Sequence, residues 1–303
     1  MIAGGTESLG LVTDVLAARP IGLAHLTLLA VSPPELIEIA AAAGYDFVGI
    51  RVRAVTDAER EFPMHPGTPM LADTVARLQD TRVEVRDIEF LPLTATTTAA
   101  DWLPALEAGA ALGARVFTVA GADDDRARLH DTLAALTVAA ADFGIRPALE
   151  PISYQSVSTV ADATELASST GAAILLDSLH LQRGGSTLMD VAGLPSDLVP
   201  VVQLCDVPLL APHDDGDRVA TLQREARQER LPVGRGELAL VDLISVCPPA
   251  VPVSLEIPNA SLQRTMSALA WAQLNLEAMR ALLTETETPA AYSALGTEER
   301  RSE

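Results

Sequence analysis

Four short segments of this chain end in polar side chains that could bind a metal ion together. The segments are LEP (149–151), LLDSLH (175–180), VVQLCD (201–206) and SLEIP (254–258), and their polar residues are Glu150, Asp177, Gln203 and Glu256. In a (β/α)8 barrel, polar residues at the carboxyl ends of successive strands converge above the barrel mouth. Three carboxylates and one amide oxygen form a hard, oxygen-rich donor set that suits Mg²⁺ or Mn²⁺.

A single acid at the end of a buried strand has an ordinary structural explanation, such as an ion pair with an arginine. Four polar residues in one place are harder to explain in this way, because uncompensated carboxylates in a shared cavity repel each other and resist ionisation. A divalent cation removes the repulsion, and Gln203 adds a ligand without adding charge. The pattern therefore predicts a metal site at these strand ends.

Eight β-type runs alternate with helical stretches that are rich in alanine and leucine. The predicted strands are 21–29, 46–52, 82–90, 115–119, 146–150, 172–177, 198–204 and 251–257. The predicted helices are 33–43, 69–80, 100–112, 124–143, 159–168, 187–192, 238–246 and 262–283. This alternation predicts an α/β fold, a (β/α)8 TIM barrel in a single domain. An open doubly wound sheet is the alternative, although no GxGxxG motif follows the first strand.

The predicted barrel spans residues 21–283, between an N-terminal extension (1–20) and a C-terminal tail (284–303) that loses periodicity and is expected to be disordered. The longest gap between strands runs from 206 to 251 and includes the charged stretch TLQREARQERL, which is expected to be helical. Long loops at the carboxyl ends of strands usually cover active sites. We expect this segment to cover the site.

The acidic composition narrows the range of partners. A net charge of −20 repels nucleic-acid phosphates and anionic membranes. The sequence shows neither an apolar stretch of about 20 residues, which a membrane span requires, nor the features of a signal peptide. Two cysteines make a disulfide framework improbable and fit a reducing cytoplasm. Cys205 could be a nucleophile, but a small core residue is the simpler interpretation.

Other side chains could line the barrel mouth. His180 follows Asp177 by three residues and could act as a proton shuttle or substrate donor. Arg51 and Arg53 fall at the end of the second predicted strand, and only one of them is expected to face the interior. A pocket arginine would bind a carboxylate or phosphate group. The candidates for substrate binding are Arg51, Glu89, Arg227 and Arg235.

The remaining histidines are expected to have structural or solvent-exposed positions. His25 on the first strand and His65 in the FPMHPG loop could also reach the mouth, with packing as the default interpretation. His213 falls in a polar loop, and His130 is assigned to a solvated helix face.

Six motifs in a fixed order carry a family resemblance between about residues 22 and 283. They are PPELIEIAAAAGYDFVGIR, LEP, LLDSLHLQRGG, VQLCD, LPVGRGEL and SLEIP. With these motifs the chain resembles the sugar phosphate isomerase/epimerase family of xylose isomerase-like TIM barrels. The resemblance implies one divalent metal ion, Mn²⁺ or Mg²⁺ first and Co²⁺ or Zn²⁺ as further candidates. Its ligands would be Glu150, Asp177, Gln203 and Glu256.

The resemblance also implies roles and shows two departures. Family members usually have histidine where this chain has Gln203, and their PGEG-like loop reads Val-Gly-Arg-Gly at 233–236 here. His180 matches a family histidine. A metal that coordinates a carbonyl oxygen and an adjacent hydroxyl acidifies the intervening C–H. Glu256 would then be the base, Glu150 the second acid or base, and His180 a further catalytic residue.

Several functions follow as hypotheses. The first is a metal-dependent isomerase or epimerase of a keto-sugar, sugar acid or hydroxy-keto acid in carbohydrate metabolism. The second is a metal-dependent lyase similar to inosose or 3-dehydroshikimate dehydratases, because the arginine-rich loop favours a carboxylated substrate. A non-catalytic ligand-binding barrel remains a third. Five scattered histidines and the acidic charge disfavour endonuclease IV-like chemistry. A homo-oligomer is also expected, either through the helix around Trp271 or with that helix simply packed in the core.

Overall fold

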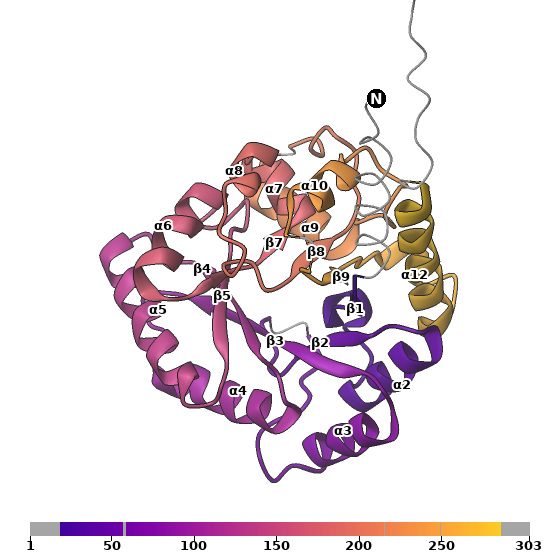
Figure 1. Ribbon diagram of the computed structural model, residues 1–303, viewed down its shortest axis with the longest axis horizontal. Helices are drawn as coiled ribbons and strands as arrows, with labels where there is room; N and C mark the ends of the chain where they lie inside the picture. Colours follow the sequence, from indigo (N-terminus) through magenta and orange to yellow (C-terminus); the bar gives the residue numbers. More distant parts are fainter. Residues whose placement is uncertain (1–18, 57–58, 215, 249, 286–303) are drawn as a thin grey trace, which may run out of the picture.

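The computed structural model describes residues 19–56, 59–214, 216–248 and 250–285. Helices surround a central set of strands (Figure 1). The predicted extension (1–20) and tail (284–303) fall outside the described residues except at their inner ends. Within the described ranges, no helix is long and apolar enough to cross a membrane.

All pairings between neighbouring strands are parallel, as in the predicted barrel. The strands are β1 (Ile21–Leu23), β2 (Phe47–Arg51), β3 (Glu84–Leu93), β4 (Val116–Gly121), β5 (Arg146–Glu150), β6 (Ala173–Ile174), β7 (Leu176–Asp177), β8 (Val202–Leu204) and β9 (Val253–Leu255). Their order is β6-β5-β4-β3-β2-β1-β9-β8-β7. Leu175 alone separates β6 from β7, so these are two parts of one predicted strand. Because β6 pairs with β5 and β7 pairs with β8, this strand closes the barrel.

The helices follow the strands in the predicted alternation. They are η1 (His25–Leu28), α2 (Pro33–Ala43), α3 (Pro69–Asp80), α4 (Ala99–Leu112), α5 (Arg126–Ala141), α6 (Val160–Thr170), α7 (Ser178–Gly184), α8 (Leu188–Ala192), α9 (Arg218–Gln228), α10 (Leu240–Val246), α11 (Ala260–Gln263) and α12 (Ala268–Glu285). Helices α2 and α3 have the predicted bounds, since each starts with proline in its first turn. Gly44 ends α2 with φ 94°, a conformation that glycine adopts without a steric penalty.

Several elements have shifted bounds, and three differ most from the prediction. The first strand ends at Leu23 rather than continuing to 29, because the Thr27 hydroxyl donates to Leu255 O and accepts from Ile257 N, both at 2.8 Å. These side-chain bonds replace further backbone pairing with β9, and the chain forms η1. Helix α7 falls outside the predicted helices, and the predicted helix 262–283 is divided into α11 and α12.

The barrel interior has an apolar floor beneath the predicted site. A compact buried cluster is formed by Phe47, Val116, Ala148, Ala173, Leu175 and Val201. Ala148, Leu175 and Val201 each precede a predicted metal ligand by two positions. Because side chains alternate along a strand, residues two apart share a face. The predicted ligands therefore point into the barrel, one layer above the apolar cluster.

Helix α12 contributes to the core through Trp271. This side chain is 1% exposed, and its indole N–H donates to Ile257 O at 3.2 Å. Tyr45 of the α2–β2 connection donates to Ala272 O at 2.9 Å. Trp271 is thus packed inside the chain, and a homo-oligomer stays a prediction.

Gly49 on β2 makes room for two acidic side chains of β3. A Cβ at this position would lie 2.5 Å from Asp87 Oδ2 and 2.8 Å from Glu89 Oε1. Both carboxylates are buried in the barrel, so neither can move aside freely. We expect Gly49→Ala to lower the free energy of unfolding by about 1–3 kcal/mol, the usual cost of overpacking, as measured by urea denaturation.

The matched control for this change is Gly193→Ala. Gly193 has φ −82°, and the nearest atom to its added Cβ would be 3.7 Å away. A loss in Gly49→Ala no larger than in the control would show that the barrel interior accommodates the extra methyl group.

Candidate active site

The long segment between β8 and β9 is fixed at its base by Asp206. The backbone of Asp206 pairs with Leu231 through two hydrogen bonds of 2.8 and 2.9 Å. Its carboxylate accepts from Gly234 N and Leu238 N, both at 3.0 Å. Gly236 lies so close to Asp206 that a Cβ would overlap the carboxylate. This base brings α9 and the residues after it to the barrel mouth, as predicted for this segment.

A cavity at the carboxyl ends of the strands contains most of the predicted site residues. The predicted residues that line it are Arg51, Glu89, Glu150, His180, Gln203, Arg227 and Glu256. Asp177 is fully buried beside them. Arg235 is exposed on its loop and is not among the lining residues of this cavity.

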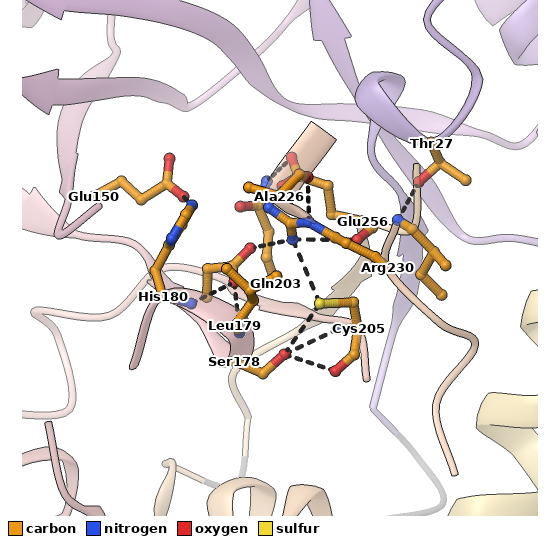
Figure 2. Close-up of polar contacts among 12 residues, drawn as sticks. Thr27, Glu150, Ser178, Leu179, His180, Gln203, Cys205, Ala226, Arg230 and Glu256 are labelled. Atoms are coloured by element: carbon orange, nitrogen blue, oxygen red, sulfur yellow. Dashed lines mark hydrogen bonds and ion pairs between the residues drawn. The ribbon is translucent and has the colours of Figure 1, made fainter. Parts of the chain in front are cut away.

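Arg230 lies within this site and is not among the predicted residues. It is 1% exposed, and its guanidinium bridges two of the predicted metal ligands. Nη1 is 2.6 Å from Asp177 Oδ2, and Nη2 is 3.0 Å from Glu256 Oε2. Nε donates to Ala226 O at 2.7 Å, which folds the side chain back toward α9. Figure 2 shows Arg230, Gln203 and Glu256 on one side of the site, with Glu150 and His180 on the other.

The surroundings of Glu150 and Glu256 favour the protonated, uncharged form of their carboxyl groups. Burial raises the pKa of Glu256 to about 8; Arg230 opposes the shift, and Asp177 adds to it. Burial also raises the pKa of Glu150 well above its usual range, and the negative charges of Glu256 and Asp177 add to this effect. For Asp177, burial would raise the pKa, but Arg230 leaves it lowered overall. The site therefore combines one ionised carboxylate with two carboxyl groups that readily hold a proton.

His180 is oriented by its neighbours and is neutral. It belongs to α7, whose N-terminus is capped by Asp177 Oδ1 accepting from Leu179 N at 2.8 Å and His180 N at 3.1 Å. The imidazole Nδ1 is 3.2 Å from Ser153 Oγ, and Nε2 is 3.8 Å from Glu150 Oε1. Burial lowers the pKa of His180 to about 4. A neutral imidazole close to Glu150 can exchange a proton with it or with a bound hydroxyl.

Arg51, at the end of β2, and Glu89, on β3, form a second charged group in the cavity. Arg51 Nε lies 3.5 Å from Glu89 Oε2, and Arg51 Nη1 lies 3.4 Å from Glu59 Oε2. Arg53 points elsewhere and donates to Asp101 O at 3.1 Å, so only Arg51 reaches the cavity. Strict alternation would place both arginines on one face, but β2 ends at Arg51, and Arg53 lies beyond it. Burial raises the pKa of Glu89 to about 7, with Arg51 opposing the shift.

Asp87 lies below Glu89 on the same face of β3 and has a strongly perturbed acidity. Burial, followed by the charge of Glu256, raises the pKa of Asp87 to about 7, against about 3.9 in an unfolded chain. The folded state therefore binds this proton more tightly than the unfolded state. The contribution of Asp87 to stability is present at acidic pH and is lost as the pH rises through about 7.

We expect the effect of Asp87→Asn on the free energy of unfolding to be more favourable at pH 8 than at pH 5. The difference should be on the order of 2 kcal/mol, because asparagine needs no proton to stay neutral. Urea denaturation at the two pH values measures the effect. Asp73→Asn on the exposed face of α3 is the control and should show no such pH dependence. Equal effects of Asp87→Asn at both pH values would mean that Asp87 is ionised in the folded protein at pH 5 as well.

Arg227 and Tyr154 form a polar wall of the cavity. Both line it, and the charge of the nearby Arg227 opposes the rise in the Tyr154 pKa that burial causes. Tyr154 also packs edge-on against His180, with ring centroids 5.5 Å apart. The sequence pattern does not single out Tyr154, since this residue follows β5 in an irregular loop. Arg51 and Arg230 contact carboxylates, whereas Arg227 contacts a phenol.

The other histidines lie outside the cavity. His25 is in η1 rather than on a strand, fully buried, with Nδ1 accepting from Arg51 N and Nε2 facing Val31 O. His65 and His213 are exposed in loops, and His130 is half-buried on α5. These positions agree with the structural or solvent-exposed locations that were expected for these histidines.

Cys205 is fully buried between Ser178 and Arg230. Burial raises the pKa of its thiol to about 12. This environment favours the core interpretation over a nucleophile.

The donors at the strand ends suit a divalent ion in kind. Gln203 Oε1 is buried and has no hydrogen-bond partner, and the charge of Glu256 adds to the raised pKa of Glu150. Their arrangement is less open than the sequence suggests, since Arg230 already contacts Asp177 and Glu256. Among the described residues, no three or more His, Cys, Asp and Glu side chains are gathered as a metal-binding group. The amide oxygen and the carboxylates fit a hard cation. Such a cation would compete with Arg230 for Asp177 and Glu256.

Sequence comparison assigns the family. A sequence model described as the xylose isomerase-like TIM barrel matches residues 37–286. The chain belongs to this family. No protein of curated function matches the sequence significantly.

Solved structures share the barrel at low sequence identity. The IolI protein with a bound zinc atom has a TM-score of 0.67 and 15% identity, over 88% of this chain and 97% of that one. The 3-keto-D-glucoside 4-epimerase YcjR from E. coli has a TM-score of 0.61 and 16% identity, over 87% and 99%. The D-allulose 3-epimerase from Methylomonas sp., in complex with D-allulose, has a TM-score of 0.59 and 17% identity, over 87% and 97%. At these identities the likeness establishes the fold, and the reaction has to be argued from the site.

Proposed function

We propose that this protein is an isomerase or epimerase that moves a proton next to the carbonyl of a small keto-sugar, sugar acid or hydroxy-keto acid. The observation that carries the proposal is the position of Glu150 and Glu256. These carboxyl groups come from non-adjacent strands, line one cavity and have raised pKa values. A group whose pKa lies near the working pH can both accept and return a proton.

The residues of the cavity have separable roles in this proposal. Glu256 removes the proton from the substrate carbon, and Glu150 returns one. His180, 3.8 Å from Glu150, exchanges a proton with Glu150 or with a substrate hydroxyl. Arg51 and Arg227 bind the end of the substrate that lies away from the reacting carbon. Because the site is buried, water is kept away from the carbanion that forms when the proton is removed. Arg235 is exposed on its loop and does not line the cavity, so we assign it no role here.

A divalent metal ion is part of the proposal. Its ligands would be Glu150, Asp177, Gln203 and Glu256, with Mn²⁺ or Mg²⁺ favoured by the oxygen donors. Such an ion would polarise the substrate carbonyl and so acidify the neighbouring C–H. The zinc bound by the IolI protein is consistent with a metal in a barrel of this kind.

Deuterium exchange tests the function across a whole class of candidate substrates. The protein is incubated in D2O with Mn²⁺ or Mg²⁺ and with a panel of keto-sugars, sugar acids and hydroxy-keto acids. We expect deuterium at the carbon next to the carbonyl of at least one compound, by NMR and mass spectrometry. The Glu150→Gln, Glu256→Gln double variant should show none. Absence of exchange across the panel, with tight binding of one compound, would favour the non-catalytic barrel.

A dehydratase is the second candidate, favoured by Arg227. In an acidic chain this cavity arginine contacts the neutral Tyr154 rather than a carboxylate, so its charge is available to a substrate carboxylate. Dehydration begins with the same proton abstraction and continues with loss of a β-hydroxyl. In the exchange experiment it would appear as a product that is lighter by one water.

A further inference from the structure

The site already contains a cation in contact with two of its proposed metal ligands. The Arg230 guanidinium approaches Asp177 Oδ2 at 2.6 Å and Glu256 Oε2 at 3.0 Å, and all three side chains are almost fully buried. Such contacts are strong in a buried site, because little water is present to screen the charges. The ion pairs also explain how Asp177 and Glu256 are accommodated close together in a buried site.

The remaining oxygens of these two carboxylates have donors as well. Asp177 Oδ1 accepts from two backbone N–H groups at the start of α7. Glu256 Oε1 accepts from the Gln203 amide at 3.0 Å, which turns the amide oxygen of Gln203 away from Glu256. Figure 2 shows these contacts around Arg230. Every oxygen of Asp177 and Glu256 is therefore occupied by a donor, and half of these oxygens are occupied by Arg230.

We propose that Arg230 is the resident counter-ion of the metal-free site, and that a divalent cation binds by displacing its guanidinium from Asp177 and Glu256. The inference rests on the proposed metal site. A guanidinium and a metal ion cannot use the same lone pairs of a carboxylate. Their like charges would also repel each other if both contacted Asp177 and Glu256. The contacts of Arg230 with Ala226 O, 2.7 Å, and Glu256 O, 3.2 Å, use no proposed ligand atom, so they can retain the side chain nearby.

Two substitutions separate the effect of the Arg230 charge from the effect of its contacts with Asp177 and Glu256. Arg230→Met removes both the charge and the bridge while keeping much of the side-chain volume. Arg230→Lys keeps the charge, but a single ammonium group cannot reproduce the planar fork that spans two carboxylates. Arg224→Met is the control, because Arg224 lies on α9, the helix just before Arg230, and forms an exposed pair with Glu229.

The measurement is calorimetric titration of the chelator-treated protein with Mn²⁺ and with Mg²⁺, together with thermal unfolding with and without metal. We expect Arg230→Met to bind metal at least about 10-fold more tightly than the unchanged protein, since one opposing charge is removed. Arg230→Lys should fall between them, and Arg224→Met should bind like the unchanged protein. Without metal, Arg230→Met should unfold at a lower temperature, and metal should raise that temperature more than in the unchanged protein.

The outcomes distinguish this inference from the proposed function. Equal or weaker metal binding by both Arg230 variants would overturn the displacement and leave the metal site in place. Binding by Arg230→Met alone would support Arg230 as the competing cation and remove the metal from the proposed function. Absence of binding by every variant would contradict both. If Arg230→Met is unfolded without metal, Arg230→Lys decides the question, since tighter binding in a variant that keeps the charge identifies the bridge as the obstacle.

Discussion

Replacing Glu256 by glutamine is expected to lower the rate of deuterium exchange into the substrate by about 10²–10⁴-fold, the range typical of a removed general base. Glutamine keeps the size of the side chain and can still accept from Arg230, but it cannot take up a proton. Glu256 lines the cavity, and its pKa is raised to about 8, so its carboxylate takes up a proton more readily than that of an ordinary glutamate. The exchange rate is measured by NMR on a substrate identified in the panel.

Glu229→Gln is the control for this experiment, since Glu229 pairs with Arg224 at the surface and is far less buried than Glu256. It should retain the exchange rate of the unchanged protein. If Glu256→Gln retains exchange while Glu150→Gln loses it, the two carboxyl groups have the opposite roles. Loss of exchange together with a large fall in unfolding temperature would point to structural damage instead.

Asp177→Asn is expected to destabilise the metal-free protein by about 3–5 kcal/mol, the usual cost of removing one partner from a buried ion pair. Asparagine can still cap α7 through its oxygen, so the main loss is the 2.6 Å ion pair with Arg230. Arg230 would retain Glu256 as its remaining carboxylate partner. Urea denaturation in the presence of a chelator measures this change.

A second substitution separates the ion pair from the cap. In the Asp177→Asn, Arg230→Met double variant no uncompensated guanidinium remains, so we expect the loss to be smaller than the sum of the single losses. Asp190→Asn, at the exposed capping box of α8, is the matched control for an Asp-to-Asn change at a helix start and should cost far less. Strictly additive losses would show that Asp177 and Arg230 stabilise the protein independently.

The barrel was predictable because its strands carry local signals. Each inner strand is a short apolar run, and glycines such as Gly44 and Gly171 mark the preceding helix ends. The end of β1 carries no such signal, since it depends on Thr27 reaching Leu255, which is 228 positions away in the chain. Helix α7 has seven residues, and its capping residue, Asp177, also has the features of a metal ligand.

The candidate site was predictable as far as strand ends determine it. Glu150, Gln203 and Glu256 line the cavity because a polar residue that ends a barrel strand faces the mouth. Arg230 could not be found in this way. It follows a charged helix that resembles a solvated surface, and its partner Asp177 is 53 positions away. Only the folded chain shows that this arginine is buried while Arg227 and Arg235, on either side of it, are not.

The anchoring of the long segment at Asp206 has a consequence for how such a protein can change. Because residues 206 and 231 are paired, the stretch between them leaves the barrel and returns to the same point. A stretch with coincident ends can be lengthened, shortened or exchanged for another without altering the strands below it. Arg227 and Arg230 lie at its returning end. Transplanting this stretch between related barrels would therefore carry a new cavity wall, and with it a new ligand preference, in one contiguous piece.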